Sequence, residues 1–110
     1  ANHIQEAPVW IIPVLRNTAE SSNPRAGSSI YGAIQNLMLA ARAYGIGATL
    51  TTLYASHENH VKELLNIPED AMTMALIPLG YPDRGRWARP KRRAAEEVTY
   101  WDSWASEKLR

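Results

Sequence analysis

The sequence predicts a mixed α and β fold in which helices pack against a sheet. Two apolar runs rich in β-branched residues, at 8–15 and 72–79, have the composition of strands. Between them, apolar residues at helical spacing and a glycine-terminated end predict a helix over 29–44. The expected order is strand, helix, short strand, helix, strand, loop and tail. The 110 residues are a length typical of one domain.

The first expected strand, residues 8–15 (PVWIIPVL), is a continuous apolar run. Its valines and isoleucines are β-branched, and Trp10 also favours an extended backbone. Pro13 has no N–H group to donate to a sheet ladder, so it belongs at a sheet edge or at a bulge. The polar residues 17–27 that follow contain Pro24 and are expected to form a loop.

The expected helix over 29–44 has apolar side chains on nearly all of its sides. Its apolar positions are Ile30, Ala33, Ile34, Leu37, Met38, Leu39, Ala40, Ala41 and Ala43. Ser28 or Ser29 is expected to cap its first turn, and Gly45 to end it in the left-handed conformation. A helix of this kind is buried on most faces. A chain this short can hardly enclose it alone, so we expect another half-domain or a partner subunit against it.

A short extended segment and a second helix are expected next. Residues 46–53 have an extended pattern, and Ser56 is expected to cap a helix that ends near Asn66. The buried stripe of that helix would consist of Val61, Leu64 and Leu65.

The last expected strand covers residues 72–79 (MTMALIPL), and a turn follows at 80–83. The tail 95–110 is rich in large apolar side chains. They are Val98, Tyr100, Trp101 and Trp104. We expect this tail to dock on another surface, because a row of exposed tryptophans is costly.

Composition excludes several kinds of site and partner. The chain has no cysteine, which excludes disulfides, thiolate metal sites and cysteine nucleophiles. The net charge is +1 with 21% charged residues, so the overall charge does not indicate nucleic acid or an anionic membrane as a partner. The apolar runs fall short of the ~20 residues that a membrane span needs, and no signal peptide is visible. We expect a cytoplasmic protein that binds no metal. The chain begins at Ala1, which we interpret as a fragment or a processed chain.

The segment Gly45-Ile46-Gly47 resembles the start of a dinucleotide-binding fingerprint. In that fingerprint a third glycine should stand where this chain has Leu50, and a strand should come first. Here a helix comes first. A helix stop therefore accounts better for these glycines.

The segment 57–60 (HENH) resembles a zinc-protease helix at first sight. That motif needs two histidines four residues apart on one helix face, whereas His57 and His60 are three apart. We expect residues 57–60 to face solvent in the first turns of a helix. Glu58, near the helix start, would interact favourably with the helix dipole.

Residues 84–93 hold six of the chain's 12 basic residues. These are Arg84, Arg86, Arg89, Lys91, Arg92 and Arg93. The favoured interpretation is a solvated loop, balanced by nearby acidic residues. Two alternatives stay open: a nucleic-acid patch in which Trp87 stacks on bases, and a local phosphate site. One or two arginines would suffice for a phosphate, because a guanidinium offers it paired, charge-assisted hydrogen bonds.

Three threonines follow the glycine turn, at positions 49, 51 and 52. They are ordinary strand residues on composition alone. The functional alternative is that the N–H groups of this extended segment point at a ligand's carbonyl or ring nitrogen. The sequence shows no Ser/His/Asp constellation, no carboxylate pair and no phosphate-cradling glycine loop, so it predicts no catalytic side chain.

Several stretches, taken together, resemble the C-terminal half of the nitroreductase family of flavin enzymes. They are APVWIIPVL, AIQNLMLAARAYGIGATLTT, VKELLNIPED, LIPLGYP and KRRAAEEVTYWDSW, in the family's order and with its spacing over 7–104. No single motif is decisive, but the ordered set is fairly specific.

The resemblance implies an α+β nitroreductase-like fold, with a mixed sheet packed by helices, that binds FMN in an intertwined homodimer. The central helix would then lie buried at the dimer interface. The segment Leu50, Thr51 and Thr52 would lie along the flavin ring. Arg92, with Lys91 beside it, would pair with the flavin phosphate. NAD(P)H would be the reductant, and a nitro compound, a quinone or a similar acceptor would be reduced.

The family's N-terminal half has no counterpart here. That half carries an arginine- and serine-containing motif for the phosphate, and an Asn/Gln-Pro-Trp type segment for the ring. We therefore expect residues 1–110 to be the C-terminal portion of a single nitroreductase-like domain, completed by a homodimer partner or by a complementary chain. The main prediction is an FMN-dependent oxidoreductase subunit or fragment. The alternative is a non-catalytic module that binds flavin or dimerises, and a weaker one is a nucleic-acid-binding piece.

Overall fold

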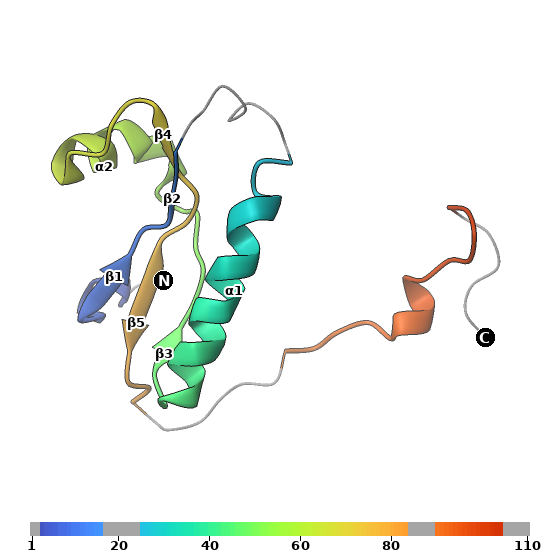
Figure 1. Ribbon diagram of the computed structural model, residues 1–110. Coiled ribbons are helices and arrows are strands. Elements are labelled where there is room, and N and C mark those ends of the chain that lie inside the picture. The colour runs from blue at the N-terminus through green and yellow to red at the C-terminus, as the bar shows by residue number, and fades with distance from the viewer. Residues whose placement is uncertain (1–2, 17–24, 84–89, 105–110) are drawn as a thin grey trace.

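The computed structural model describes residues 3–16, 25–83 and 90–104 (Figure 1). Its α-helices are α1 (Ser28–Ala43) and α2 (Glu58–Leu65). Its strands are β1 (Val9–Ile11), β2 (Val14–Arg16), β3 (Gly47–Ala48), β4 (Ala71–Thr73) and β5 (Ile77–Gly80). The same described ranges also contain the short 3-10 helices η1 (Ile4–Glu6), η3 (Ala55–His57) and η4 (Ala95–Glu97). The predicted mixture of α and β elements is confirmed.

The described strands form two sheets, whereas the sequence favoured one. One sheet has the order β1-β5-β3 and the other pairs β2 with β4, and every pairing is antiparallel. Each long apolar run thus contributes a strand to both sheets. The first run divides around Pro13, which cannot donate to a ladder but accepts a hydrogen bond at its carbonyl from the Met74 N–H, at 2.9 Å.

Helix α1 lies beside the three-stranded sheet and forms the core with it (Figure 1). The buried centre consists of Ile34, Ala75 and Ile77. Partly buried side chains packed on this centre are Ile11, Ile30, Leu37, Met38, Ala48 and Leu79. One helix on one sheet face therefore supplies four of these nine residues, and the strands and the segment before β5 supply the rest.

The prediction for the C-terminal end of α1 is confirmed, and the prediction for its N-terminal cap is not. Gly45 has a φ of +74°, so it ends the helix in the left-handed conformation as predicted. The predicted serine cap is wrong. Ser28 and Ser29 lie inside the first turn, and their hydroxyls donate to the carbonyls of Arg25 and Ala26 at 2.7 and 2.9 Å. Gly27 takes the cap position, where the Tyr31 ring leaves no room for a Cβ.

Burial of α1 is one-sided in this chain, although its composition predicts burial on most faces. Only Ile34 and Ala41 are buried, and Leu39 on another side is 57% exposed. The described residues supply one sheet to pack against, and nothing among them covers the other sides of the helix. The expectation that the chain cannot enclose this helix by itself agrees with the structure.

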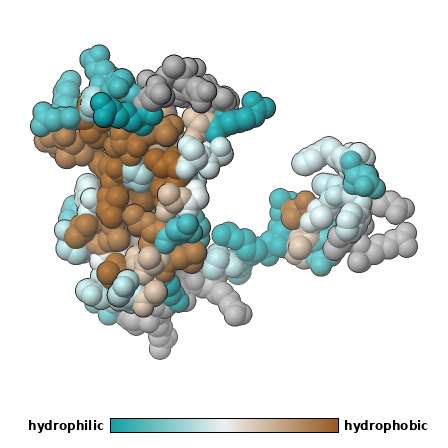
Figure 2. Space-filling view, in the orientation of Figure 1, coloured by the Kyte–Doolittle hydropathy of each residue, from teal (hydrophilic) through white to brown (hydrophobic). Residues whose placement is uncertain are grey.

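Helix α2 differs from its prediction at its start and along its apolar side. Ser56 makes no cap, because its hydroxyl bonds to the neighbouring His57 ring at 2.9 Å. The predicted buried stripe is wrong within the described chain: no α2 residue is buried, and Leu64 is 72% exposed. The predicted stripe of Val61, Leu64 and Leu65 instead lines an apolar hollow of about 450 Å³ together with Trp10 of β1. Figure 2 shows apolar side chains gathered around this side of the molecule.

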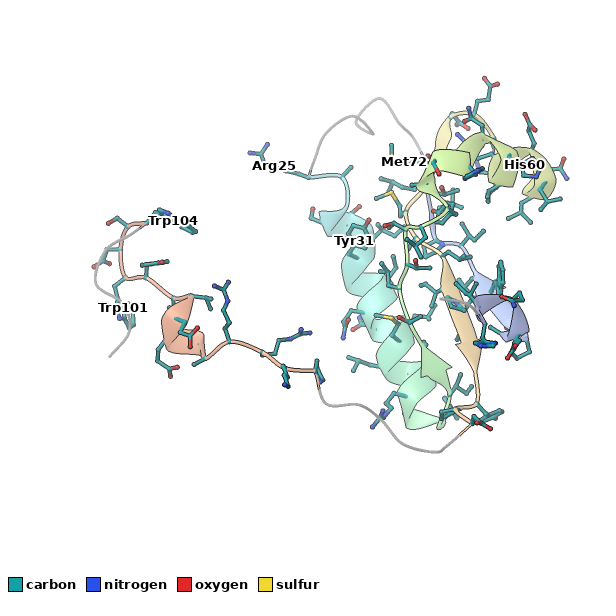
Figure 3. All side chains as sticks on the ribbon, turned by 180° about the vertical axis from the view of Figure 1, so that it is seen from behind. Arg25, Tyr31, His60, Met72, Trp101 and Trp104 are labelled. Atoms are coloured by element: carbon teal, nitrogen blue, oxygen red, sulfur yellow. The ribbon has the colours of Figure 1, made fainter. Side chains whose placement is uncertain are left out.

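Residues 90–104 extend away from the sheets and helices (Figure 1). Trp101 and Trp104 are exposed, and Figure 3 shows both at the far end of this segment. The rings of Tyr100 and Trp104 lie 5.3 Å apart between centroids. The predicted docking of the tail stays a prediction, since the described part of the chain offers it no surface in this arrangement.

Candidate functional site

The candidate site begins at the open edge of the three-stranded sheet, where residues 49–52 continue β3. Gly47 pairs with Gly80 and Ala48 with Leu79, and the isolated bridge between Thr51 and Leu76 keeps the same register. Residue 49 therefore lies opposite residue 78, which is a proline. In an antiparallel ladder that position requires an N–H from each residue, and Pro78 has none. The ladder is interrupted there and resumes at Thr51.

Backbone donors alternate in direction along this edge. Thr51 donates its N–H to the Leu76 carbonyl at 3.0 Å and accepts the Leu76 N–H at 2.9 Å. The N–H groups of Leu50 and Thr52 must then point away from β5, because successive donors of a strand face opposite sides. Within residues 3–16, 25–83 and 90–104, neither of these two N–H groups has a hydrogen-bond partner. The edge thus presents two donors to a ligand.

A hollow of about 730 Å³ lies beside this edge, within the ~300–1,000 Å³ typical of small-molecule sites. One wall is a single face of α1, formed by Gln35, Met38 and Arg42. The other residues lining it are Ile46, Ala48, Thr49, Leu50, Pro90 and Arg92. The described lining therefore contains two guanidinium groups, a mainly apolar floor and no carboxylate.

The structure brings some of the predicted site residues together and separates others. Leu50 and Arg92 line the same hollow, although they are far apart in the sequence. Thr51, Thr52 and Lys91 are not among its lining residues. The expectation that Thr51 offers its N–H to a ligand needs correction, because that group is bonded to Leu76. Thr52 retains the outward donor, and Lys91 is exposed beside Arg92.

Sequence reasoning missed two polar residues of the hollow, Gln35 and Arg42. Their spacing carries a signal: together with Met38 they fall at positions i, i+3 and i+7 of one helix, which share one face. Neither residue is among the apolar positions that predict this helix. Only the fold shows that this face borders the sheet edge and Arg92.

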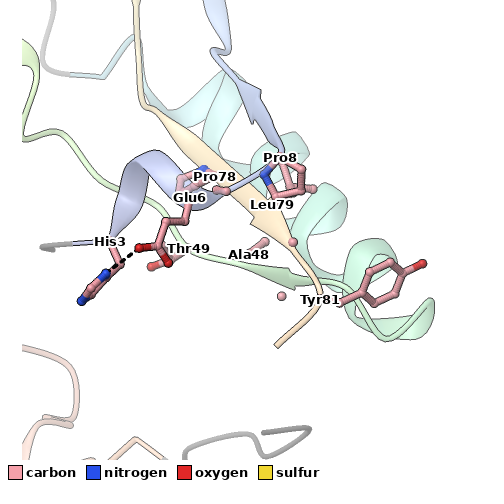
Figure 4. Close-up of a pocket in the computed structure, with 11 residues that line it drawn as sticks. His3, Glu6, Pro8, Ala48, Thr49, Pro78, Leu79 and Tyr81 are labelled. Atoms are coloured by element: carbon pink, nitrogen blue, oxygen red, sulfur yellow. Dashed lines mark hydrogen bonds and ion pairs between the residues drawn. The ribbon is translucent and has the colours of Figure 1, made fainter. Parts of the chain in front are cut away.

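A second hollow, of about 560 Å³, lies on the η1 side of β3 (Figure 4). The ring of His3 and the carboxylate of Glu6, both exposed, are hydrogen-bonded at 2.7 Å in this hollow, and Tyr81 stands at the opposite end. No group of three metal-binding side chains occurs in the part of the chain that the structure describes. The pair is therefore accounted for as a local contact at the start of the chain.

The zinc-protease interpretation of residues 57–60 fails on the spacing of the histidines, and the structure gives Glu58 a structural role. His57 and His60 are exposed as expected, and Figure 3 shows His60 on the outside of α2. Glu58, however, is half-buried. One of its carboxylate oxygens accepts the N–H and the hydroxyl of Thr73, at 2.8 and 2.7 Å. The glutamate thus ties α2 to β4, so the expectation that it faces solvent is wrong.

Tyr54 lies next to this contact and connects residues 50–52 with α2. Burial is the largest cause that raises the pKa of its phenol above 10.0, and the charge of Glu58 and the nearby Tyr31 raise the pKa further. A hydrogen bond with Thr73 acts in the opposite direction. Tyr31 itself donates its hydroxyl to the Met74 carbonyl at 3.0 Å (Figure 3). These contacts are structural, because they join α1, α2 and β4.

None of the helices in the described ranges combines the length and apolarity needed to cross a membrane. The described fold is α+β, and its hollow is lined by two arginines beside a sheet edge with outward backbone N–H groups. Guanidinium groups of this kind suit an anionic group such as a phosphate.

The model of the Nitroreductase family matches residues 1–81, so the chain belongs to the nitroreductase family. A protein of Methanothermobacter thermautotrophicus, named for NADH dehydrogenase or NAD(P)H nitroreductase activity, is 33% identical over 81 residues. The match covers 72% of this chain and 42% of that relative. A protein of the same name from Archaeoglobus fulgidus is 40% identical over 52 residues, which are 46% of this chain and 30% of the relative. The chain thus spans less than half the length of these relatives.

Solved structures share the fold. A protein from Parabacteroides distasonis, again named for NADH dehydrogenase or NAD(P)H nitroreductase activity, has a TM-score of 0.70 at 26% identity, covering 94% of this chain and 66% of its own. The FMN- and NADPH-dependent nitroreductase NfnB of Sphigopyxis sp. strain HMH has a TM-score of 0.74 at 20% identity, covering 90% and 44%. Iodotyrosine deiodinase bound to FMN and 3-iodo-L-tyrosine has a TM-score of 0.69 at 23% identity, covering 90% and 49%. The last two similarities concern the fold alone. The predicted nitroreductase-like fold is confirmed.

Proposed function

We propose that this chain forms part of an FMN-dependent NAD(P)H oxidoreductase of the nitroreductase type. The observation that carries the proposal is the hollow in which Leu50, at the open sheet edge, and Arg92 meet. Membership of the nitroreductase family supports an oxidoreductase in general. The names of two structural neighbours, one FMN- and NADPH-dependent and one bound to FMN, support the choice of cofactor.

The donors of the site fit the two ends of FMN. Arg92 carries a charge that no acidic residue in the described ranges neutralises by an ion pair, so it suits the phosphate. Lys91 is exposed next to it and adds positive charge. The outward N–H groups of Leu50 and Thr52 suit the polar edge of the ring. Thr51 holds the segment in place through its paired bonds to Leu76.

Bound FMN supplies the chemistry, which is the transfer of two electrons from NAD(P)H to a nitro compound, a quinone or a similar acceptor. The residues of this chain bind and orient the cofactor. With FMN bound along this edge, the outward Leu50 and Thr52 N–H groups would stabilise negative charge on the reduced ring. Arg92 would hold the phosphate as an anchor.

We also propose that a partner completes the site, either a second copy of this chain in a homodimer or a complementary chain carrying the rest of the domain. The sides of α1 that the described residues leave uncovered support this proposal. The exposed Leu39 marks the face that the partner would cover.

A second candidate function is a non-catalytic module that binds flavin or dimerises without turnover. The observation that favours it is the uncovered side of α1, where the exposed Leu39 leaves an apolar surface for dimerisation. Such a module would retain FMN in the hollow but would not pass electrons from NAD(P)H.

The test is to purify the chain with any partner that accompanies it, saturate it with FMN, remove free flavin and record the absorption spectrum. Retained flavin that is bleached by NADH or NADPH and reoxidised by a quinone or a nitro compound is the expected result. Retained flavin that neither nicotinamide reduces would favour the non-catalytic module. An assembled oligomer that retains no flavin would contradict both.

A further inference from the structure

We infer that Arg42 of α1 and Arg92 form a two-arginine clamp for one phosphate group in the hollow between α1 and β3. The inference deepens the proposed function, because it assigns the phosphate-binding side chains of this same site. It also adds a residue, Arg42, that the sequence analysis did not assign to the site.

The first support is the arrangement of the two residues in space. Arg42 lies on the last turn of α1 and Arg92 lies fifty positions later, yet both line one hollow. Gln35 stands two turns earlier on the same helix face and adds an uncharged amide. Three side chains able to donate hydrogen bonds therefore converge on one space from two segments.

The second support is the charge balance. Of the described residues that line the hollow, two carry a positive charge and none carries a negative one. The remaining described lining is largely apolar, so these two exposed guanidinium groups are its charged partners for an anion. An anion with several acceptor oxygens in different directions suits two guanidinium forks, whereas a single carboxylate needs only one.

Arg42 could also have a purely structural role, which must be distinguished from phosphate binding. A cation in the last turn of a helix interacts favourably with the negative end of the helix dipole, whatever lies nearby. A lysine at this position would keep that interaction, since it keeps the charge. It would lose the paired geometry that a guanidinium offers to a phosphate. Arg42→Lys therefore separates the two roles.

Two phosphates are chemically equivalent candidates for the clamp: that of FMN, and the 2′-phosphate that distinguishes NADPH from NADH. The flavin arm compares the dissociation constants of FMN and riboflavin, which differ only by the phosphate. The nicotinamide arm compares the dissociation constants of NADPH and NADH on the flavin-loaded protein. Each comparison is a ratio, so a partial loss of folded protein cancels.

If the flavin phosphate occupies the clamp, Arg42→Ala should reduce the preference for FMN over riboflavin about tenfold and leave riboflavin binding unchanged, as expected for one lost charge-assisted contact. Arg42→Lys should lose an intermediate amount. If the nicotinamide phosphate occupies it, the same variants should instead reduce the preference for NADPH over NADH. Arg16→Ala is the matched control, because this exposed arginine pairs with Asp70 and does not line the hollow.

A measurement without flavin makes the clamp independent of the proposed function. Inorganic phosphate is titrated into the purified protein while the side-chain N–H signals of the arginines are followed by NMR. Saturable shifts of Arg42 and Arg92, without a shift of Arg16, would support the clamp even if the protein retained no flavin. Unchanged ligand ratios in Arg42→Ala, together with no saturable phosphate shift at Arg42, would overturn the clamp and leave the proposed flavin function standing.

Discussion

Glu58 holds Thr73 by two hydrogen bonds to one carboxylate oxygen, one from the backbone N–H at 2.8 Å and one from the hydroxyl at 2.7 Å. Thr73 belongs to β4, whose other side pairs with β2. The glutamate therefore takes the place that a further strand would occupy. It satisfies a donor at the edge of the two-stranded sheet, on a residue that is itself buried.

Glu58→Ala should lower the free energy of unfolding by about 1–3 kcal/mol, because the buried Thr73 N–H loses its acceptor. Glu58→Gln should cost less, since its amide oxygen still accepts. Urea unfolding measures both changes. Glu63→Ala, on the exposed side of the same helix, is the control and should change stability little. Equal stability of the Glu58→Ala and Glu63→Ala variants would show that the contact contributes nothing.

Tyr54 should make stability depend on alkaline pH. Burial raises the pKa of its phenol in the folded protein, so the unfolded chain loses this proton first. The contribution is fully present below the pKa of the unfolded chain, 10.0, and is lost as the pH rises through the folded value. The urea midpoint should therefore fall as the pH rises above about 10.

Tyr54→Phe should flatten this alkaline fall, because the titrating group is removed. Tyr44→Phe, at an exposed tyrosine at the end of α1, is the matched control. Parallel curves for the wild-type and Tyr54→Phe proteins would mean that the buried phenol is not linked to folding.

Aspartate substitutions on two sides of α1 should have different effects. Leu37 packs on the buried centre of the domain, so Leu37→Asp places an unpaired charge there and should unfold the chain. Leu39 is exposed, so Leu39→Asp should leave the fold intact and weaken association with a partner. Circular dichroism reports the fold and sedimentation reports the assembly. An unchanged oligomer in Leu39→Asp would rule out this face as the partner surface.

Arg92→Ala should weaken FMN retention about tenfold with little change in the fold, since an exposed residue that follows the last strand is not part of the core. Fluorescence titration with FMN measures the affinity. Arg93→Ala is the neighbouring control, and Lys91→Ala should have a smaller effect because Lys91 does not line the hollow. Equal losses in all three variants would indicate a diffuse effect of net charge.

The sequence was sufficient for the elements whose local signals agree with the global fold. The α1 pattern and Gly45 predicted that helix and its end, and the β-branched runs located all the residues of β1 and β5 except Gly80. It was not sufficient for the division of those runs into two sheets. A proline in an apolar run is compatible with an edge, a bulge or a break, and only the pairing of Ile11 with Ile77 and of Leu15 with Met72 decides.

The predictions of the helix caps and of Arg42 failed for a related reason. Ser28 and Ser56 have the composition of caps, but each hydroxyl found a closer partner, which composition cannot show. Leu50 and Arg92 were predicted only through the family resemblance, and whether they bind a cofactor stays a prediction. Arg42 was missed because a helix position reveals its surroundings only when the facing strand is known.

The proline opposite Thr49 gives the ribbon after β3 an uncommon mechanical property. The ribbon is fastened at Gly47–Ala48 and again at Thr51, while the peptide units between have no complete pairing. The backbone dihedrals of residues 49 and 50 can therefore change slightly without breaking the hydrogen bonds on either side. A flat ligand that binds against this segment would require little rearrangement of the sheet, so its dissociation rate would depend mainly on the contacts it makes.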